Sequence, residues 1–287
     1  MPFSRHSTSL FWRRGRCPGD PTADIILEPT EDRLFPLRDD NPTSLTPIIT
    51  WLIVATNVAV WFLVQGAGLD AATLANSVCA FGSISAELTQ GARGVVELAP
   101  GLPPCRLGGL TTTTLLTSMF MHGGWMHLIS NMWFLWIFGN NIEDSMGHLR
   151  FLLFYLITGL AASGAHILSA PASMIPTVGA SGAISGIMGG YLLLYPRVKV
   201  HTLFIIIFYI RVIPVSAWVI LLWWFVLQVI SGTATPLDGG GVAFWAHIGG
   251  FIAGVVLVKL FENRQLVAAR RQHIQLSPFE VEHRGWF

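Results

Sequence analysis

Charged side chains are scarce in this sequence. Asp, Glu, Lys and Arg make up only 11% of its 287 residues, whereas they supply about 25% of a typical soluble domain. Five long stretches contain none of them: 41–69, 107–142, 151–196, 212–237 and 239–258. A membrane-spanning helix needs about 20 predominantly apolar residues, and a soluble protein would have to bury every one of these stretches. The shortage of charge therefore predicts an integral membrane protein.

Three other features that the sequence lacks argue against a nucleic-acid-binding protein, a zinc protein and a secreted protein. The formal net charge is only +1, so nothing indicates a nucleic-acid partner. The three cysteines show neither CxxC nor the Cys/His spacing of a zinc site. The first forty residues are polar and charged, unlike a secretory signal peptide. Cys79 and Cys105 share one predicted loop, where a disulfide and two free thiols are both compatible with the sequence.

Six apolar stretches are predicted to cross the membrane, with approximate bounds 48–67, 115–138, 151–169, 179–195, 212–230 and 244–261. The apolar run 200–210 is only about half a span long, and we interpret it as an interfacial or re-entrant piece. The predicted fold class is an all-α membrane protein, a six-transmembrane-helix bundle over residues 47–262. A polar N-terminal cytoplasmic tail (1–46) and a C-terminal cytoplasmic tail (263–287) flank it.

The distribution of basic residues predicts the orientation. Lys and Arg concentrate on the cytosolic side of membrane proteins. Six spans put both basic tails on one side together with Arg150, Arg197 and Lys199, and leave only Arg93 and Arg106 for the other side. We therefore expect both termini in the cytoplasm, and we expect a bacterial inner membrane.

This topology gathers polar side chains at one depth near the outer face. Spans two, four and six begin there, and near their starts lie five polar residues: His122, His127, Asn131, Ser181 and His247. Ionisable groups within spans are costly to bury and are functional candidates by default. The first turn of a helix also offers unpaired N–H groups and a positive dipole end, which stabilise an oxyanion. A serine needs an adjacent base to become a nucleophile, so we predict that His247 activates Ser181.

Glycines predict how these two residues meet. They recur every four residues in spans four and six, at Gly182, Gly186 and Gly190 and at Gly250 and Gly254. Small residues at this spacing let membrane helices approach closely, which would bring Ser181 and His247 within reach. No carboxylate is placed to complete a triad, so the sequence predicts a dyad.

The second span adds further polar groups. His127 and Asn131 are four residues apart and share a helical face, from which both can donate to a developing negative charge. His122 lies at or before the start of the helix, and we expect it to bond within the structure. The His122/His127 spacing of five and the lack of an accompanying carboxylate or cysteine argue against a metal site, and we expect no cofactor.

Together, His122-x4-His127-x3-Asn131, Gly179-x-Ser181-Gly182 and Ala246-His247-x-x-Gly250-x3-Gly254 resemble the rhomboid intramembrane proteases. The resemblance covers roughly residues 48–261. It implies a serine endopeptidase that cleaves transmembrane segments of single-span membrane proteins near their outer ends, within the lipid bilayer.

The same resemblance implies individual roles. Ser181 would be the nucleophile and His247 the base, with an oxyanion hole made by the His127 and Asn131 side chains and the Ser181 backbone N–H. Gly179, Gly182 and His122 would support the site. The segment after span two, with Glu143, Gly147 and Arg150, also looks like the family's pattern.

The sequence departs from the family at two places. Many members carry Trp-Arg in the first loop, where residues 111–114 are all threonine, and some carry a tyrosine four residues after the serine, where this chain has Ser185. Two other readings stay open: an inactive rhomboid-like protein that binds membrane helices, and a small-solute transporter. Transporters often contain repeated halves, and the sequence shows no convincing repeat.

Overall fold

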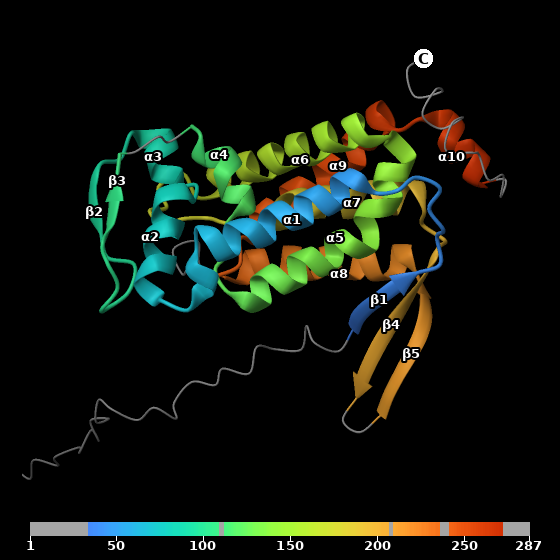
Figure 1. Ribbon diagram of the computed structural model, residues 1–287, viewed down its shortest axis with the longest axis horizontal. Coiled ribbons are helices and arrows are strands. Elements are labelled where there is room, and N and C mark those ends of the chain that lie inside the picture. Colours follow the sequence, from blue (N-terminus) through green and yellow to red (C-terminus); the bar gives the residue numbers. More distant parts are fainter. Residues whose placement is uncertain (1–33, 109–111, 207–208, 236–240, 272–287) are drawn as a thin grey trace, which may run out of the picture.

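A computed structural model describes residues 34–108, 112–206, 209–235 and 241–271 (Figure 1). The described helices are α1 Ile48–Leu63, α2 Ala71–Phe81, α3 Ser85–Gln90, α4 Thr114–Thr117, α5 Trp125–Met146, α6 His148–Ser169, α7 Ser181–Leu194, α8 Ala217–Ala234, α9 Phe244–Phe261 and α10 Arg264–Arg271. The described strands are β1 Leu34–Asp39, β2 Gly94–Val96, β3 Cys105–Leu107, β4 Lys199–Ile206 and β5 Tyr209–Ser216.

Each of the six stretches predicted to span the membrane overlaps a helix: α1, α5, α6, α7, α8 or α9. Helix α5 continues to Met146, past the end predicted for the second stretch at residue 138. Within the described residues, three of them (α6, α8 and α9) are long and apolar enough to cross a membrane by length and composition. Helices α1 and α7 are apolar but shorter, with 16 and 14 residues. The second stretch begins later than predicted, because the chain before Trp125 forms α4 and a 3-10 turn instead of the first turns of α5.

Residues 200–210, interpreted from the sequence as an interfacial or re-entrant piece, belong in their described part to two strands that the sequence analysis did not predict. Strands β4 and β5 form an antiparallel hairpin, and β1 pairs with β4 to complete a three-stranded sheet of order β1-β4-β5. The hairpin is rich in β-branched residues, which favour strands, and it delays the fifth helix from Val212 to Ala217. The all-α class is therefore right for the bundle but omits two sheets. Strand β1 lies in the segment assigned to the N-terminal tail, whereas residues 1–33 and 272–287 lie outside the described residues.

Helix α7 runs through the middle of the bundle. Every residue from Gly182 to Tyr191 is buried, which explains how a 14-residue helix serves in the core. Its glycines allow close contact on two sides. A Cβ on Gly186 would lie 2.4 Å from Thr158 Cβ on α6, whereas a Cβ on Gly254 of α9 would lie 1.9 Å from the Gly186 carbonyl oxygen. The α7 stripe thus faces α6, and the α9 stripe meets the backbone of α7.

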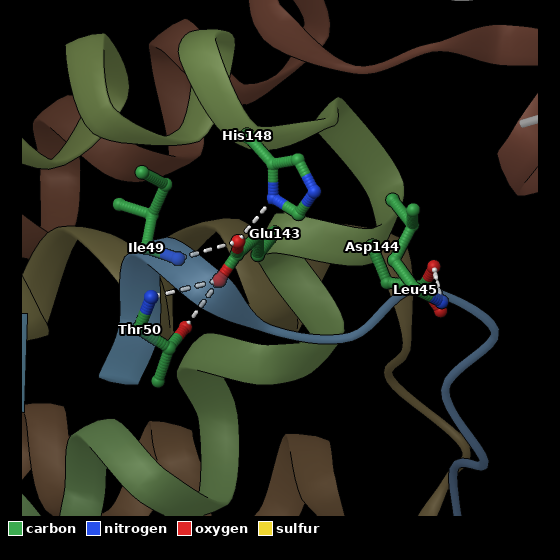
Figure 2. Close-up of polar contacts among 6 residues, drawn as sticks. All are labelled: Leu45, Ile49, Thr50, Glu143, Asp144 and His148. Carbon is green, nitrogen blue, oxygen red and sulfur yellow. Dashed lines mark hydrogen bonds and ion pairs between the residues drawn. The ribbon is translucent and has the colours of Figure 1, made fainter. Parts of the chain in front are cut away.

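An anionic side chain fixes the start of α1 (Figure 2). Glu143, near the end of α5, is fully buried and accepts hydrogen bonds from the backbone N–H groups of Ile49 (2.9 Å) and Thr50 (2.8 Å). The Thr50 hydroxyl donates to it as well, at 2.7 Å, and His148 contacts its other oxygen. A carboxylate at a helix N-terminus satisfies unpaired N–H groups and complements the helix dipole. Glu143 thus lies within α5 and not, as predicted, in a segment that follows the second span, and its contacts with α1 give this acidic residue a structural role.

The long connection between α1 and α5 is structured and lies at the end of the bundle opposite to β4 and β5 (Figure 1). Cys79 of α2 and Cys105 of β3 form a disulfide, which decides between the two alternatives that the sequence left open. The connection also holds the segment before α7, because Ser83 and Thr177 exchange two backbone hydrogen bonds of 2.9 and 2.8 Å.

Candidate active site

Ser181 and His247 lie side by side although 66 residues separate them. Ser181 is the first residue of α7, and His247 lies in the first turn of α9. Their Oγ and Nε2 atoms are 2.7 Å apart. A Cβ on Gly250 would lie 2.0 Å from the carbonyl oxygen of Gly182, so only glycine permits this approach of the two helices. The predicted pair thus lies within hydrogen-bonding reach, but it is the glycine stripe of α9 that permits the approach, since the stripe of α7 faces α6.

The base has a partner that the sequence analysis missed. Gln228 of α8 is buried, and its Oε1 lies 2.8 Å from His247 Nδ1. An amide oxygen can only accept, so Nδ1 carries the proton in a neutral ring and Nε2 is left as the acceptor. The Ser181 hydroxyl therefore donates to Nε2, as a general base requires. In the sequence, Gln228 could have been recognised as a candidate because it is an amide within an otherwise apolar part of the fifth predicted span.

An aromatic ring of α8 also packs against the His247 imidazole. Trp224, one turn before Gln228, has its ring centroid 5.7 Å from that of His247, at an interplanar angle of 34°. Ser185, one of the two departures noted in the sequence analysis, donates its hydroxyl to the Ser181 carbonyl oxygen at 2.6 Å. Helix α8 thus supplies the aromatic contact that α7 lacks.

Gly179 lets the chain before α7 pass close to the His127 ring. A Cβ built on Gly179 would lie 2.7 Å from His127 Nε2 and 3.4 Å from Ser181 Oγ. Its φ of +130° also disfavours any side chain. His127 Nδ1 accepts from the Gly123 backbone N–H at 3.3 Å, so a neutral ring carries its proton on Nε2, the atom nearest to Gly179. A hydrogen-bond donor therefore lies near the nucleophile.

The other two residues predicted on the second span occupy different surroundings. Asn131 is buried, and its Nδ2 donates to the His127 carbonyl oxygen at 2.7 Å, which engages one of its two N–H groups within the helix. His122 is fully buried, and its ring meets that of His127 edge-on at 5.1 Å between centroids. Its backbone exchanges hydrogen bonds with the Gln65 side chain, at 2.7 and 2.8 Å. The expected hydrogen bonds are thus made by the His122 backbone only: among the residues that the structure describes, both ring nitrogens are buried without a hydrogen-bond partner, and the ring packs against that of His127.

A cavity opens beside Ser181. Its lining includes polar groups from several elements: Ser83, Ser118, Ser163, His166, Thr177 and Ser181. Alanines and glycines of α6, α7 and α9 form much of the rest. A polar cavity next to a nucleophile is where water can be held inside an apolar bundle. The site therefore combines a hydroxyl, an adjacent base, a hydrogen-bond donor near the nucleophile and a cavity with polar groups in its wall.

Comparison with known proteins matches this chain to one family. The model described as "Rhomboid domain" matches residues 110–264, more than half of the chain. Rhomboid-like protein 11, chloroplastic, of Arabidopsis thaliana is 34% identical over 166 residues, which cover 52% of this chain and 52% of that protein. Rhomboid protein 1, mitochondrial, of Saccharomyces cerevisiae is 29% identical over 169 residues, 57% of this chain and 46% of that protein.

A bacterial relative covers more of the chain. The rhomboid protease GluP of Bacillus subtilis is 31% identical over 209 residues, 72% of this chain but only 34% of its own length. The chain thus spans about half the length of the curated relatives it matches, or less.

Proposed function

Since the chain belongs to the rhomboid family, we propose that it is an intramembrane serine endopeptidase that cleaves transmembrane segments of other membrane proteins. The observation that carries this proposal is the 2.7 Å contact between Ser181 Oγ and His247 Nε2, with Gln228 holding the proton on the opposite ring nitrogen. A serine within a membrane helix ordinarily bonds its own backbone, and here it faces a base instead.

In the proposed mechanism, His247 Nε2 accepts the hydroxyl proton while Ser181 Oγ attacks the scissile carbonyl carbon. The resulting oxyanion forms beside Ser181, on the side of the His127 ring. His127 Nε2–H, the second N–H of the Asn131 amide and the Ser181 backbone N–H stabilise it, as preorganised donors do. The protonated His247 then gives its proton to the leaving amine. Water from the polar cavity hydrolyses the acyl-enzyme by the same steps with His247 again as base.

The bilayer restricts the proposed substrates. A helix in lipid satisfies its own backbone hydrogen bonds, so its carbonyls are unavailable until the helix unwinds. We propose that substrates are single-span membrane proteins that carry Gly or Pro near the cleavage point and unwind at their outer ends. No cofactor is required for these steps.

We propose six membrane-spanning helices, namely α1, α5, α6, α7, α8 and α9, with both termini in the cytoplasm. Arg93 precedes β2 and Arg106 lies in β3, in the small sheet at the end of the bundle that holds the candidate active site. Arg197 precedes β4 and Lys199 is its first residue, in the three-stranded sheet at the opposite end. The Cys79–Cys105 disulfide, which is favoured in an oxidising compartment, lies at the site's end as well. This orientation faces the active site outward, and a bacterial inner membrane remains the proposed location.

Purified protein in liposomes should cleave a single-span substrate that carries a glycine pair near its outer end. Ser181→Ala should abolish cleavage while the protein still folds, because the nucleophile is gone. Ser185→Ala, the same change one turn along α7, should retain activity. Labelling by a fluorophosphonate probe should likewise depend on Ser181. Cleavage that persists in Ser181→Ala would refute the assignment.

The two other readings predict different results in the same experiment. An inactive relative would bind the substrate helix without cleaving it and would resist the probe. A transporter would also resist the probe and would move solute across the liposome membrane in both serine variants.

A further inference from the structure

The contact between Gln228 and His247 suggests a role for helix α8 in catalysis. Most large side chains of this helix point away from the protein and are exposed, as expected for a surface that faces lipid: Trp218, Val219, Leu222, Trp223, Val226, Val229 and Ile230. Gln228 instead lies on the buried side of the helix together with Ile220 and Leu221, and it is only 3% exposed. An amide buried in an apolar environment is costly unless it is hydrogen-bonded, and its oxygen is bonded to His247 Nδ1.

We propose that Gln228 is a positioning residue for the catalytic base. The Ser181–His247 dyad then works with the imidazole held in one tautomer by the Gln228 amide, instead of unaided. This inference rests on the proposed protease function. The amide oxygen accepts the Nδ1 proton and thereby keeps Nε2 free to accept from Ser181. In a neutral imidazole one nitrogen donates and the other accepts. Without the acceptor, the ring can place its proton on Nε2, where it cannot serve as the base.

Two features of α8 fix the ring as well as its proton. Trp224 and Gln228 are four residues apart and therefore lie on the same face of the helix, where one covers the His247 ring and the other bonds its edge. Gly232 continues this face, and a Cβ there would lie 3.1 Å from Phe244 Cβ at the start of α9. Helices α8 and α9 are thus close together at the start of α9, where His247 lies.

A merely structural role for Gln228 would be to dock α8 on α9. The two roles differ in what can replace the amide, because docking needs volume whereas positioning needs an acceptor at Nδ1. Gln228→Met keeps an unbranched side chain of similar length without the acceptor oxygen, and Gln228→Glu restores an acceptor. Thr233→Val is a matched control on α8, since its hydroxyl bonds only the carbonyls of its own helix in the part of the chain that the structure describes.

The test compares initial cleavage rates of these variants in liposomes across pH. We expect Gln228→Met to lose about 10- to 100-fold, less than the roughly 10²–10⁴ that general-base catalysis itself contributes. Gln228→Glu should recover most of the rate, with the acidic limb of its pH profile moved to higher pH because a carboxylate stabilises the imidazolium. The other titratable groups that act on His247, His127 and His166, are unchanged in these variants. Thr233→Val should match the wild type.

Nitrogen-15 NMR of histidine-labelled protein tests the same contact without activity. The wild type should hold its neutral His247 proton on Nδ1, and Gln228→Met should show a mixture of the two tautomers. Equal rates for Gln228→Met and the wild type, or equally low rates for the Met and Glu variants, would overturn the inference and leave the protease proposal standing. Cleavage that survives Ser181→Ala would instead overturn the protease proposal. A wild-type proton on Nε2 would overturn the positioning role whatever the activity.

Discussion

Replacing Gly250 by alanine tests whether close approach of α7 and α9 is what holds Ser181 beside His247. Gly250 lies three residues after His247, on the side of α9 that meets α7. A methyl group there would lie 2.0 Å from the Gly182 carbonyl oxygen and 3.3 Å from Ala162 Cβ. The nearer atom belongs to the backbone, so no side-chain rotation can relieve the overlap, and the two helices must separate.

The required separation can be worked out from these distances. Ordinary contact begins at 3.4 Å, so α9 must move by about 1.4 Å at this level for the overlap to disappear. The same displacement at His247 would lengthen its 2.7 Å contact with Ser181 to about 4 Å, beyond hydrogen-bonding reach. A misplacement of about 1 Å can cost about 10²-fold in rate, and overpacking costs about 1–3 kcal/mol of stability.

We therefore expect Gly250→Ala to lose roughly 100-fold of the Ser181-dependent cleavage rate in liposomes, together with a lower unfolding temperature. Gly164→Ala on α6 is the matched control. A Cβ there meets nothing within 4 Å, so its rate should be unchanged and its stability equal or up to about 1 kcal/mol higher. Wild-type activity in Gly250→Ala, or an equal loss in both variants, would refute the reasoning.

Three further predictions concern stability and are measured by unfolding of the purified protein. Burial raises the pKa of the Asp39 carboxyl from 3.8 to about 6, although a hydrogen bond from Tyr191 opposes this. The protonated Asp39 carboxyl therefore contributes fully to the stability of the folded protein below about pH 3.8, and this contribution is lost as the pH rises through about 6. The wild type should lose stability relative to Asp39→Asn over that range. A constant stability difference between the two proteins across the range would contradict this. Glu143→Gln should cost about 1.5–3 kcal/mol, because charge-assisted hydrogen bonds to α1 are lost; an unchanged unfolding temperature would count against the anchoring role. Cys79→Ser with Cys105→Ser should cost about 2–4 kcal/mol, and a gel mobility unaffected by reductant in the wild type would argue against the bridge.

Hydropathy and charge patterns alone predict the membrane location and the approximate helix positions, since both are local properties on which the bilayer acts directly. They also single out Ser181 and His247, because a polar residue stands out within an apolar stretch and because small residues at helical spacing indicate close helix contacts. The prediction of a dyad follows from the lack of a suitably placed carboxylate, and that criterion does not apply to an uncharged amide such as Gln228.

Which groups meet across helices depends on the tertiary packing. The rotation of α8 about its axis turns Gln228 and Trp224 toward His247, and no periodicity in an almost wholly apolar helix could have shown this. The three-stranded sheet likewise needs β1, which pairs with β4 although about 160 residues separate the two strands in the chain, and no local pattern predicts a pairing at that distance. The pairing of Cys79 with Cys105 required the two backbones to come within 5.5 Å between Cα atoms, a distance that depends on how the connecting segments fold.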